Sequence, residues 1–399
     1  MEIIPPKHVR EILNRLASAG YTACIVGGCV RDAVLGVEPN DWDIASSALP
    51  EEVLALFPDS LTIGMKHGTI TVKTDEDLVE VTTFRTDGNY ADHRHPDTVS
   101  FVKDVAGDLS RRDFTINAIA VLASGEIVDP FGGQEDIRNG IVRCVGDPNL
   151  RFEEDALRMF RAFRFSSRLG FSIEDTTFRA IRDNAHLASS LAAERIRDEL
   201  EKVLMTGHPE AVAVIIDCAL LASYLTGSCG NAFDFRLLAS LPAEPCIRWS
   251  GLCHILDSSG CLSSVPDFLR SLRLDNRTMR CASEACTLLA GSPIADGPGW
   301  KRALSRFDEK SVRCAAEYWD VSCGGGFVDG LSAVIASGDC CRISQLAVSG
   351  SDIRNLGYTG KEIGICLNRL LEAVIDRPEL NCREILLDIA KKAKDHVEV

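Results

Sequence analysis

The stretch GGCVRDAVLGVEPNDWDIA, residues 27–45, decides the fold of this chain. The apolar run at residues 22–26 predicts a short strand before it, and the two glycines predict a turn that opens a helix at residues 30–35. Glycines in such a turn let backbone N–H groups approach an anion closely. Arg31 lies near the start of the helix and can bring a cation to the same anion. The segment therefore predicts a phosphate-binding turn between a strand and a helix.

Two aspartates near the end of this stretch, Asp41 and Asp43, predict a metal site. We expect a strand at residues 42–44, and residues two apart in a strand point to the same face, so both carboxylates should converge on one point. Two such oxygen ligands beside a phosphate cradle are typical of Mg²⁺. A D-x-D pair alone is common on solvated loops, but its combination with the glycine turn and Arg31 favours a catalytic metal site. The stretch contains neither a P-loop nor a G-x-G-x-x-G pattern.

The sequence around this stretch predicts an α+β fold. From Phe152 onward, apolar residues recur with the 3.6-residue period of helices and almost no strand pattern returns. We therefore expect an α/β head followed by an all-helical neck, body and tail. Further elements of the head are predicted as a helix at residues 6–20 and strands at residues 69–73, 78–84 and 119–121.

Composition excludes several classes of protein. The 399 residues are 46% hydrophobic, with no apolar run of about 18 residues that could span a membrane. The 16 cysteines show no zinc-site spacing and are expected to be reduced core residues of a cytoplasmic protein. A net charge of −15 argues against binding nucleic acid by bulk electrostatics. Residues 151–202 nevertheless carry ten basic and ten acidic side chains, so a local RNA-binding surface remains compatible with the sequence.

Besides residues 27–45, further distinctive blocks follow along the chain: LSRRDFTINAIA (109–120), IVDPFGGQEDIRNGIVRCVG (127–146), RFEEDALRMFRAFRFSSRLGF (151–171) and AERIRDELEKVL (193–204). In this order the blocks resemble one family, the class II CCA-adding enzymes (tRNA nucleotidyltransferases) and their poly(A) polymerase relatives. The catalytic domains of this superfamily are polymerase β-like, and the resemblance is dense over residues 20–205. A stretch near the end, VSGSDIRNLGYTGKEIGICLNRLLEAV (348–374), is similar to the tail of bacterial CCA-adding enzymes.

The resemblance implies an activity and assigns residues to it. The enzyme would add the 3′-terminal CCA of tRNA with CTP and ATP, and Asp41 and Asp43 would hold Mg²⁺. Gly28 and Arg31 would contact the incoming nucleotide, and Arg112 would lie near its triphosphate or sugar. A third carboxylate could contribute as well. Glu80 is the best candidate, with pairing to Arg85 as the alternative.

Asp155 and Arg158 offer a way to select C and A without a template. Cytosine and adenine present an amino donor beside a ring-nitrogen acceptor, whereas guanine and uracil present the inverse. A carboxylate only accepts and a guanidinium only donates, so the pair suits C and A. We expect both side chains on one face of a continuous helix, three residues apart. An exposed surface ion pair is the alternative, but the resemblance assigns both positions to base recognition.

Arg161 and Arg164 continue this three-residue spacing, and the resemblance places them at the nucleotide as well. Each step of three turns about 60° around a helix, so Arg164 should lie nearly opposite Asp155. It would therefore meet phosphate, RNA or a structural carboxylate more readily than the base. The polar segment 85–101 is expected to be a loop, which in CCA-adding relatives helps the switch from C to A addition.

The predicted division of the chain is a catalytic head (1–145), a neck that recognises the base (146–205), a helical body (206–335) and a tRNA-binding tail (336–399). Rival activities are the addition of A only, the addition of CC only, and poly(A) synthesis. From another class, the chain could be a catalytically silent tRNA-binding protein, which the intact Asp41 and Asp43 argue against. The oligomeric state stays open, with a homodimer among the alternatives.

Overall fold

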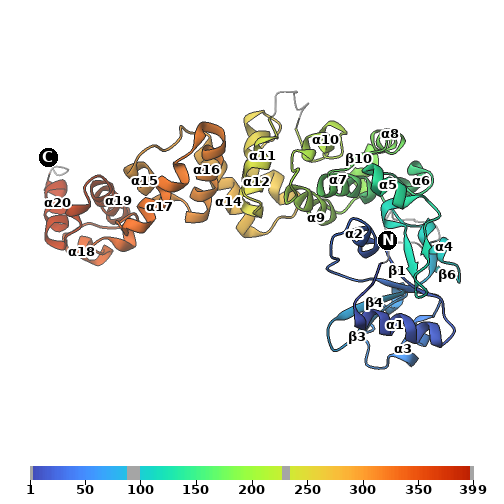
Figure 1. Ribbon diagram of the computed structural model, residues 1–399. Helices are drawn as coiled ribbons and strands as arrows, with labels where there is room; N and C mark the ends of the chain where they lie inside the picture. The colour runs from blue at the N-terminus through green and yellow to red at the C-terminus, as the bar shows by residue number, and fades with distance from the viewer. Residues whose placement is uncertain (1–2, 88–98, 227–233, 396–399) are drawn as a thin grey trace. The chain divides into compact units, whose positions relative to one another are not determined.

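The computed structural model describes residues 3–87, 99–226 and 234–395 of the chain. The protein divides into two compact units, Met1–Ser223 and Tyr224–Val399 (Figure 1). The predicted α+β fold class is confirmed, because all strands of the described residues lie in the first unit and the second contains only helices there. None of the described helices is long and apolar enough to cross a membrane. The finer division into head, neck, body and tail stays a prediction.

A six-stranded sheet in the order β3-β4-β2-β1-β7-β8 organises the head. Its strands are β1 (Ala23–Val26), β2 (Ile44–Ser46), β3 (Thr69–Lys73), β4 (Leu78–Thr83), β7 (Ala120–Leu122) and β8 (Ile127–Val128). Strands β2 and β4 are parallel, whereas the other neighbours are antiparallel. Every residue of β1 and β2 is buried, while β4 alternates between buried and more exposed positions. The two central strands therefore form the rigid support of the head.

Five helices surround this sheet: α1 (Lys7–Ser18), α2 (Gly28–Val34), α3 (Pro50–Leu56), α4 (Val105–Ser110) and α5 (Gly133–Asn139). Helix α1 buries the apolar face that its period predicts, consisting of Val9, Ile12, Leu13 and Leu16. Helices α1 and α3 pack together against the sheet (Figure 1). Strands β5 (Arg85–Asp87) and β6 (Val99–Phe101) pair at the base of the predicted loop. Residues 88–98 of that loop lie outside the described residues.

The prediction that Asp41 and Asp43 lie within a strand is wrong. Strand β2 begins only at Ile44, and both aspartates belong to the segment that leads into it. The neighbouring strand gives the reason. The Val26 amide still donates to the Asp43 carbonyl at 3.1 Å, but at Gly27 the chain turns away toward α2, so the preceding residues have no strand beside them.

The helices after the head are α6 (Pro148–Glu154), α7 (Leu157–Leu169), α8 (Asp175–Asp183), α9 (Ala193–Leu204) and α10 (Ala211–Asp217). Short parallel strands β9 (Ile141–Val142) and β10 (Ser172–Ile173) tie them to the head. The predicted continuous helix through Asp155 and Arg158 is wrong. Asp155 is extended (φ −145°, ψ 101°) and its Oδ1 accepts a hydrogen bond from the Leu157 amide at 3.1 Å. A side chain that captures a nearby amide competes with the helix, so α6 ends and α7 starts anew.

The second unit is a succession of helices: α11 (Leu237–Ser240), α12 (Pro245–Ser258), α13 (Val265–Ser271), α14 (Asn276–Leu289), α15 (Gly297–Arg306), α16 (Glu309–Trp319), α17 (Phe327–Ser337), α18 (Gly350–Asn355), α19 (Lys361–Asp376) and α20 (Arg383–Asp395). Helix α12 packs against both α14 and α16, so it is buried on nearly all sides around the fully buried Trp249. This burial explains why its sequence lacks a polar stripe.

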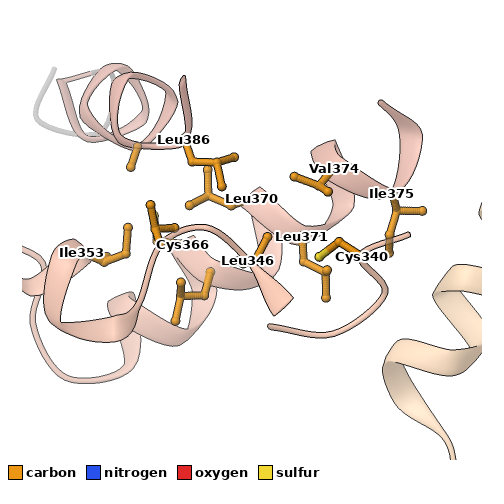
Figure 2. Close-up of a cluster of buried hydrophobic side chains, with 12 residues drawn as sticks. Cys340, Leu346, Ile353, Cys366, Leu370, Leu371, Val374, Ile375 and Leu386 are labelled. Atoms are coloured by element: carbon orange, nitrogen blue, oxygen red, sulfur yellow. The ribbon is translucent and has the colours of Figure 1, made fainter. Parts of the chain in front are cut away.

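The C-terminal helices enclose a core of their own. Figure 2 shows Leu370 of α19 facing Leu386 of α20, with Ile353 of α18 in the same cluster. Cys340 and Cys366 belong to this cluster and act as small apolar side chains. None of the fifteen cysteines within the described residues forms a disulfide, and twelve of them are buried.

Candidate active site

Asp41 and Asp43 lie at one edge of the sheet, beside a third carboxylate. Ile44 of β2 pairs with Val81 of β4 in parallel register, which places Glu80 next to Asp43. Asp41, Asp43 and Glu80 are exposed to solvent. Surrounding protein atoms reduce the hydration of Asp43 and raise the pKa of its carboxyl group, an effect that Glu80 and Asp41 strengthen and Arg112 opposes. The sheet edge therefore concentrates negative charge at one point.

This cluster is suited to a cation that shares its ligands with a substrate. Within the described residues, no three His, Cys, Asp or Glu side chains are arranged to hold a metal by themselves. Mg²⁺ is commonly held by only one or two carboxylates, with phosphate oxygens and waters as its other ligands. Asp41 and Asp43 fit that role, because exposed carboxylates that repel each other gain from a shared cation.

The glycine turn and Arg112 lie beside these aspartates. Gly27 has φ +86°, and a Cβ at this position would lie 2.9 Å from Nη1 of Arg112, so both the backbone and the close approach require glycine. Gly28 begins α2, where the first amides of a helix have no acceptor within it. Nη2 of Arg112 donates to the buried Asp108 at 3.3 Å, and the charge of Arg112 acts on Asp43. The structure thus brings together the glycine turn that contains Gly27 and Gly28, Arg112 and Asp43.

Arg31 is buried behind the turn and has three hydrogen bonds. Its Nε and Nη2 donate to Oδ1 of Asp32 at 2.8 and 2.7 Å, and its Nη1 donates to Oδ1 of Asn117 at 2.6 Å. Only 3% of the residue is exposed. Arg31 therefore fixes α2 to the segment around Asn117, and its contact with a nucleotide stays a prediction.

Asp113 connects this region to α7. It accepts hydrogen bonds from Nε and Nη2 of Arg161 at 2.8 and 2.5 Å, and from Nδ2 of Asn117 at 3.1 Å. Burial alone would raise the pKa of Asp113, but the charge of Arg161 and the hydrogen bonds from Asn117 and Arg161 hold it well below its usual value. Arg31, Asn117, Asp113 and Arg161 form one chain of contacts. Sequence reasoning missed Asp113 and Asn117, although both lie in the block RRDFTINA.

Three guanidinium groups surround Phe165, a buried residue of α7. The centres of Arg31, Arg161 and Arg164 lie 5.2, 5.5 and 4.4 Å from the centroid of its ring. Nη1 of Arg164 donates to Oε1 of the buried Glu199 at 3.0 Å, so a structural carboxylate is its partner. The aromatic ring and the carboxylates allow these like charges to gather beside the head.

Arg158 and Asp155 are both oriented by neighbours. Nη1 of Arg158 donates to Oε2 of Glu154 at 2.5 Å, and Nη2 donates to the carbonyl of Arg111 at 3.0 Å. Oδ2 of Asp155 accepts from Nη2 of Arg195 at 2.8 Å. Only 10% of the Arg158 side chain and 18% of the Asp155 side chain are exposed, which contradicts the alternative of a solvated surface pair. Sequence reasoning missed Arg195, because its partner lies 40 residues away.

Asp113→Ala should destabilise the first unit by about 3 kcal/mol, because it leaves the guanidinium of Arg161 without its buried partner. Chemical denaturation of the full chain, followed through the transition of the first unit, measures this loss. Glu11→Ala removes an exposed ion pair with Lys7 and serves as the control, with an expected change of roughly 0.5 kcal/mol or less. Equal effects of the two substitutions would contradict the structural role of Asp113.

Comparison with known proteins shows which family this chain resembles. Residues 23–143 match the family described as poly A polymerase head domain, and residues 170–225 match the probable RNA and SrmB-binding site of polymerase A. The CCA-adding enzyme of Geobacillus stearothermophilus is 41% identical over 386 residues, which cover 93% of this chain and 92% of that protein. The CCA-adding enzyme of Lactiplantibacillus plantarum is 36% identical, with coverage of 97% and 96%.

Solved structures agree with the sequence comparison. The crystal structure of the Bacillus stearothermophilus CCA-adding enzyme in complex with CTP matches with a TM-score of 0.84 at 35% identity, over 99% of each chain. The Thermotoga maritima CCA-adding enzyme complexed with tRNA shares the fold, with a TM-score of 0.62 at 19% identity. Enzymes of this kind use a divalent metal. The predicted resemblance is confirmed, and the chain belongs to the CCA-adding enzymes, a family of nucleotidyltransferases.

Proposed function

We propose that this chain builds and repairs the 3′-terminal CCA of tRNA, with CTP and ATP as substrates and pyrophosphate as product. The observation that carries the proposal is the presence of two functional residue pairs in the first unit. It joins a carboxylate pair beside a glycine turn, Asp41 and Asp43, to an acceptor and donor pair, Asp155 and Arg158. The first pair suits phosphoryl transfer and the second suits recognition of a base. The relatives named for CCA addition and the relative that binds CTP support the same activity.

In the head, we propose that Asp41 and Asp43 hold Mg²⁺, with Glu80 as a further candidate beside them. The metal would activate the 3′-hydroxyl of the tRNA and neutralise charge on the leaving pyrophosphate. The amides at Gly28 and the guanidinium of Arg112 would bind the triphosphate, and Arg31 would hold the turn in place. The hydroxyl attacks the α-phosphate directly, so catalysis consists of positioning and charge stabilisation without a covalent enzyme intermediate.

Base selection is proposed to rest on Asp155 and Arg158. The carboxylate of Asp155 would accept a hydrogen bond from the exocyclic amino group of C or A, and Arg158 would donate to the ring nitrogen. G and U would leave these groups unpaired, at a cost of about 1–3 kcal/mol for each group. Arg161 and Arg164, which contact the ring of Phe165, would complete the nucleotide-binding surface.

The remaining parts of the chain are proposed to hold the RNA. Residues 146–205 would form the base-reading neck, and residues 206–335 and 336–399 the body and tail that bind the upper half of tRNA. We propose that the protein acts in the cytoplasm, which its free and mostly buried cysteines support.

An assay with three tRNA transcripts tests this function. The transcripts end in the discriminator base, in C, or in CC, and each is incubated with CTP or ATP alone. We expect CTP to extend the first two and ATP to extend only the third. If ATP extends the third transcript but CTP extends none, the protein is an A-adding enzyme. If CTP extends the first two transcripts but ATP extends none, it is a CC-adding enzyme. Long A tracts on any transcript would indicate a poly(A) polymerase.

Removing residues 88–96 should suppress A addition while both C residues are still added. The segment joins β5 to β6, and a short Gly-Ser connection would preserve that strand pair. The expectation follows from the place of this loop in the family, where it assists the change from C to A. Single-nucleotide extension of the same transcripts measures both steps. Equal loss of C and A addition would show that the segment serves general folding or primer binding.

A further inference from the structure

An ion pair connects α9 to the break between α6 and α7. Nη2 of Arg195, in the first turn of α9, lies 2.8 Å from Oδ2 of Asp155. Helices α7 and α9 pack against each other (Figure 1). Because Asp155 is extended and outside both helices, its backbone does not by itself fix the direction of its carboxylate.

Two contacts fix this carboxylate from different sides. Oδ1 accepts from the Leu157 amide at 3.1 Å, and Oδ2 accepts from Arg195. A carboxylate has about four acceptor positions, so two remain for a ligand. Asp155 and Arg195 keep 18% and 22% of their side chains exposed, so solvent still reaches the pair. The charge of Asp155 also acts on Arg161 of the arginine cluster around Phe165.

We propose that Arg195 is a positioning residue for nucleotide selection, which holds the carboxylate of Asp155 in the orientation that reads the amino group of C and A. This inference rests on the proposed role of Asp155 in the reaction. Arg195 holds Oδ2 while the Leu157 amide holds Oδ1, so that the plane of the carboxylate stays fixed. Without this contact, the side chain can rotate about its Cβ–Cγ bond and accept from water instead, and the distinction between C and U weakens.

The alternative is that Arg195 only braces α9 against the neck. If Arg195 were only a brace, its loss would loosen the whole site and lower kcat/KM equally for every nucleotide. A positioning residue affects the ratio between nucleotides. The ratio of kcat/KM for CTP to that for UTP, measured on a tRNA that lacks CCA, therefore separates the two roles.

Arg195→Ala should lower this ratio by about tenfold, as expected for a residue that orients a functional side chain from behind. Arg195→Lys keeps the charge and should recover part of the ratio. The double variant with Asp155→Ala should be no less selective than Asp155→Ala alone, because both substitutions remove the same function. Arg197→Ala is the matched control. It lies on the same helix and loses an ion pair with Asp198, yet it should retain the ratio.

The outcomes separate this inference from the proposed function. If Asp155→Ala loses selectivity and Arg195→Ala retains it, the role of Arg195 is refuted while base reading by Asp155 stands. A uniform loss with all four nucleotides in Arg195→Ala, with a lower melting temperature, would also refute it in favour of a brace. If Asp155→Ala itself retains full selectivity, the proposed base-reading pair fails, and the inference fails with it.

Discussion

Asp43→Asn should abolish nucleotide addition while the protein stays folded and still binds tRNA. Loss of a metal ligand removes the charge on which phosphoryl transfer depends and costs several kcal/mol, so the rate should fall by roughly a hundredfold or more. Asp41→Asn should act in the same way. The measurement is single-turnover addition of CTP in Mg²⁺.

The stability of the Asp43 variant provides an independent check. The pKa of Asp43 is raised in the folded protein by reduced hydration and by Glu80 and Asp41, so its charged form is less favourable there than in the unfolded chain. Replacement by a neutral amide should therefore leave stability unchanged or slightly higher. Asp59→Asn makes the same chemical change at an exposed position after α3 and should retain full activity. A rate above about a tenth of wild type for either metal-ligand variant would contradict the assignment.

Asp155→Ala should reduce discrimination against G and U and slow the addition of C and A. One hydrogen bond to a charged group contributes roughly 1.5–3 kcal/mol, so kcat/KM for CTP should fall about ten- to a hundredfold. Values of kcat/KM for all four nucleotides on a tRNA that lacks CCA provide the measurement.

Arg158→Ala should weaken the same discrimination, but it also removes the ion pair with Glu154, which is left paired with Arg151. Its kinetics must therefore be compared with its melting temperature. Unchanged selectivity in both variants would mean that another part of the first unit reads the base.

The periodicity of apolar residues predicted the elements in which buried and exposed side chains alternate regularly. The apolar face of α1 and the residues of β3 were predicted correctly, because each side chain there follows the period of its own element. The predictions for Asp43 and Asp155 failed for different local reasons. A strand needs a neighbour, and β1 ends before it can pair with Asp41. A continuous helix needs each amide for its own backbone hydrogen bonds, but the Leu157 amide donates to the side chain of Asp155 instead.

The partners of the site residues could not be predicted from spacing. Arg161 pairs with Asp113, 48 residues earlier, and Arg164 pairs with Glu199, 35 residues later. Such pairs depend on how α7 packs against the head and against α9. The spacing of residues within one segment holds no information on this packing. The residue types were nevertheless informative, since a carboxylate lies beside each guanidinium that the sequence singled out on α7.

The protein alone, without a nucleic-acid template, should specify the sequence CCA. A tRNA transcript that ends in the discriminator base, incubated with the purified enzyme and all four nucleotides together, tests it through sequencing of the product 3′ ends. We expect nearly all extended molecules to end in CCA and addition to stop there. Products with G or U in these positions, or with A tracts of varied length, would contradict it.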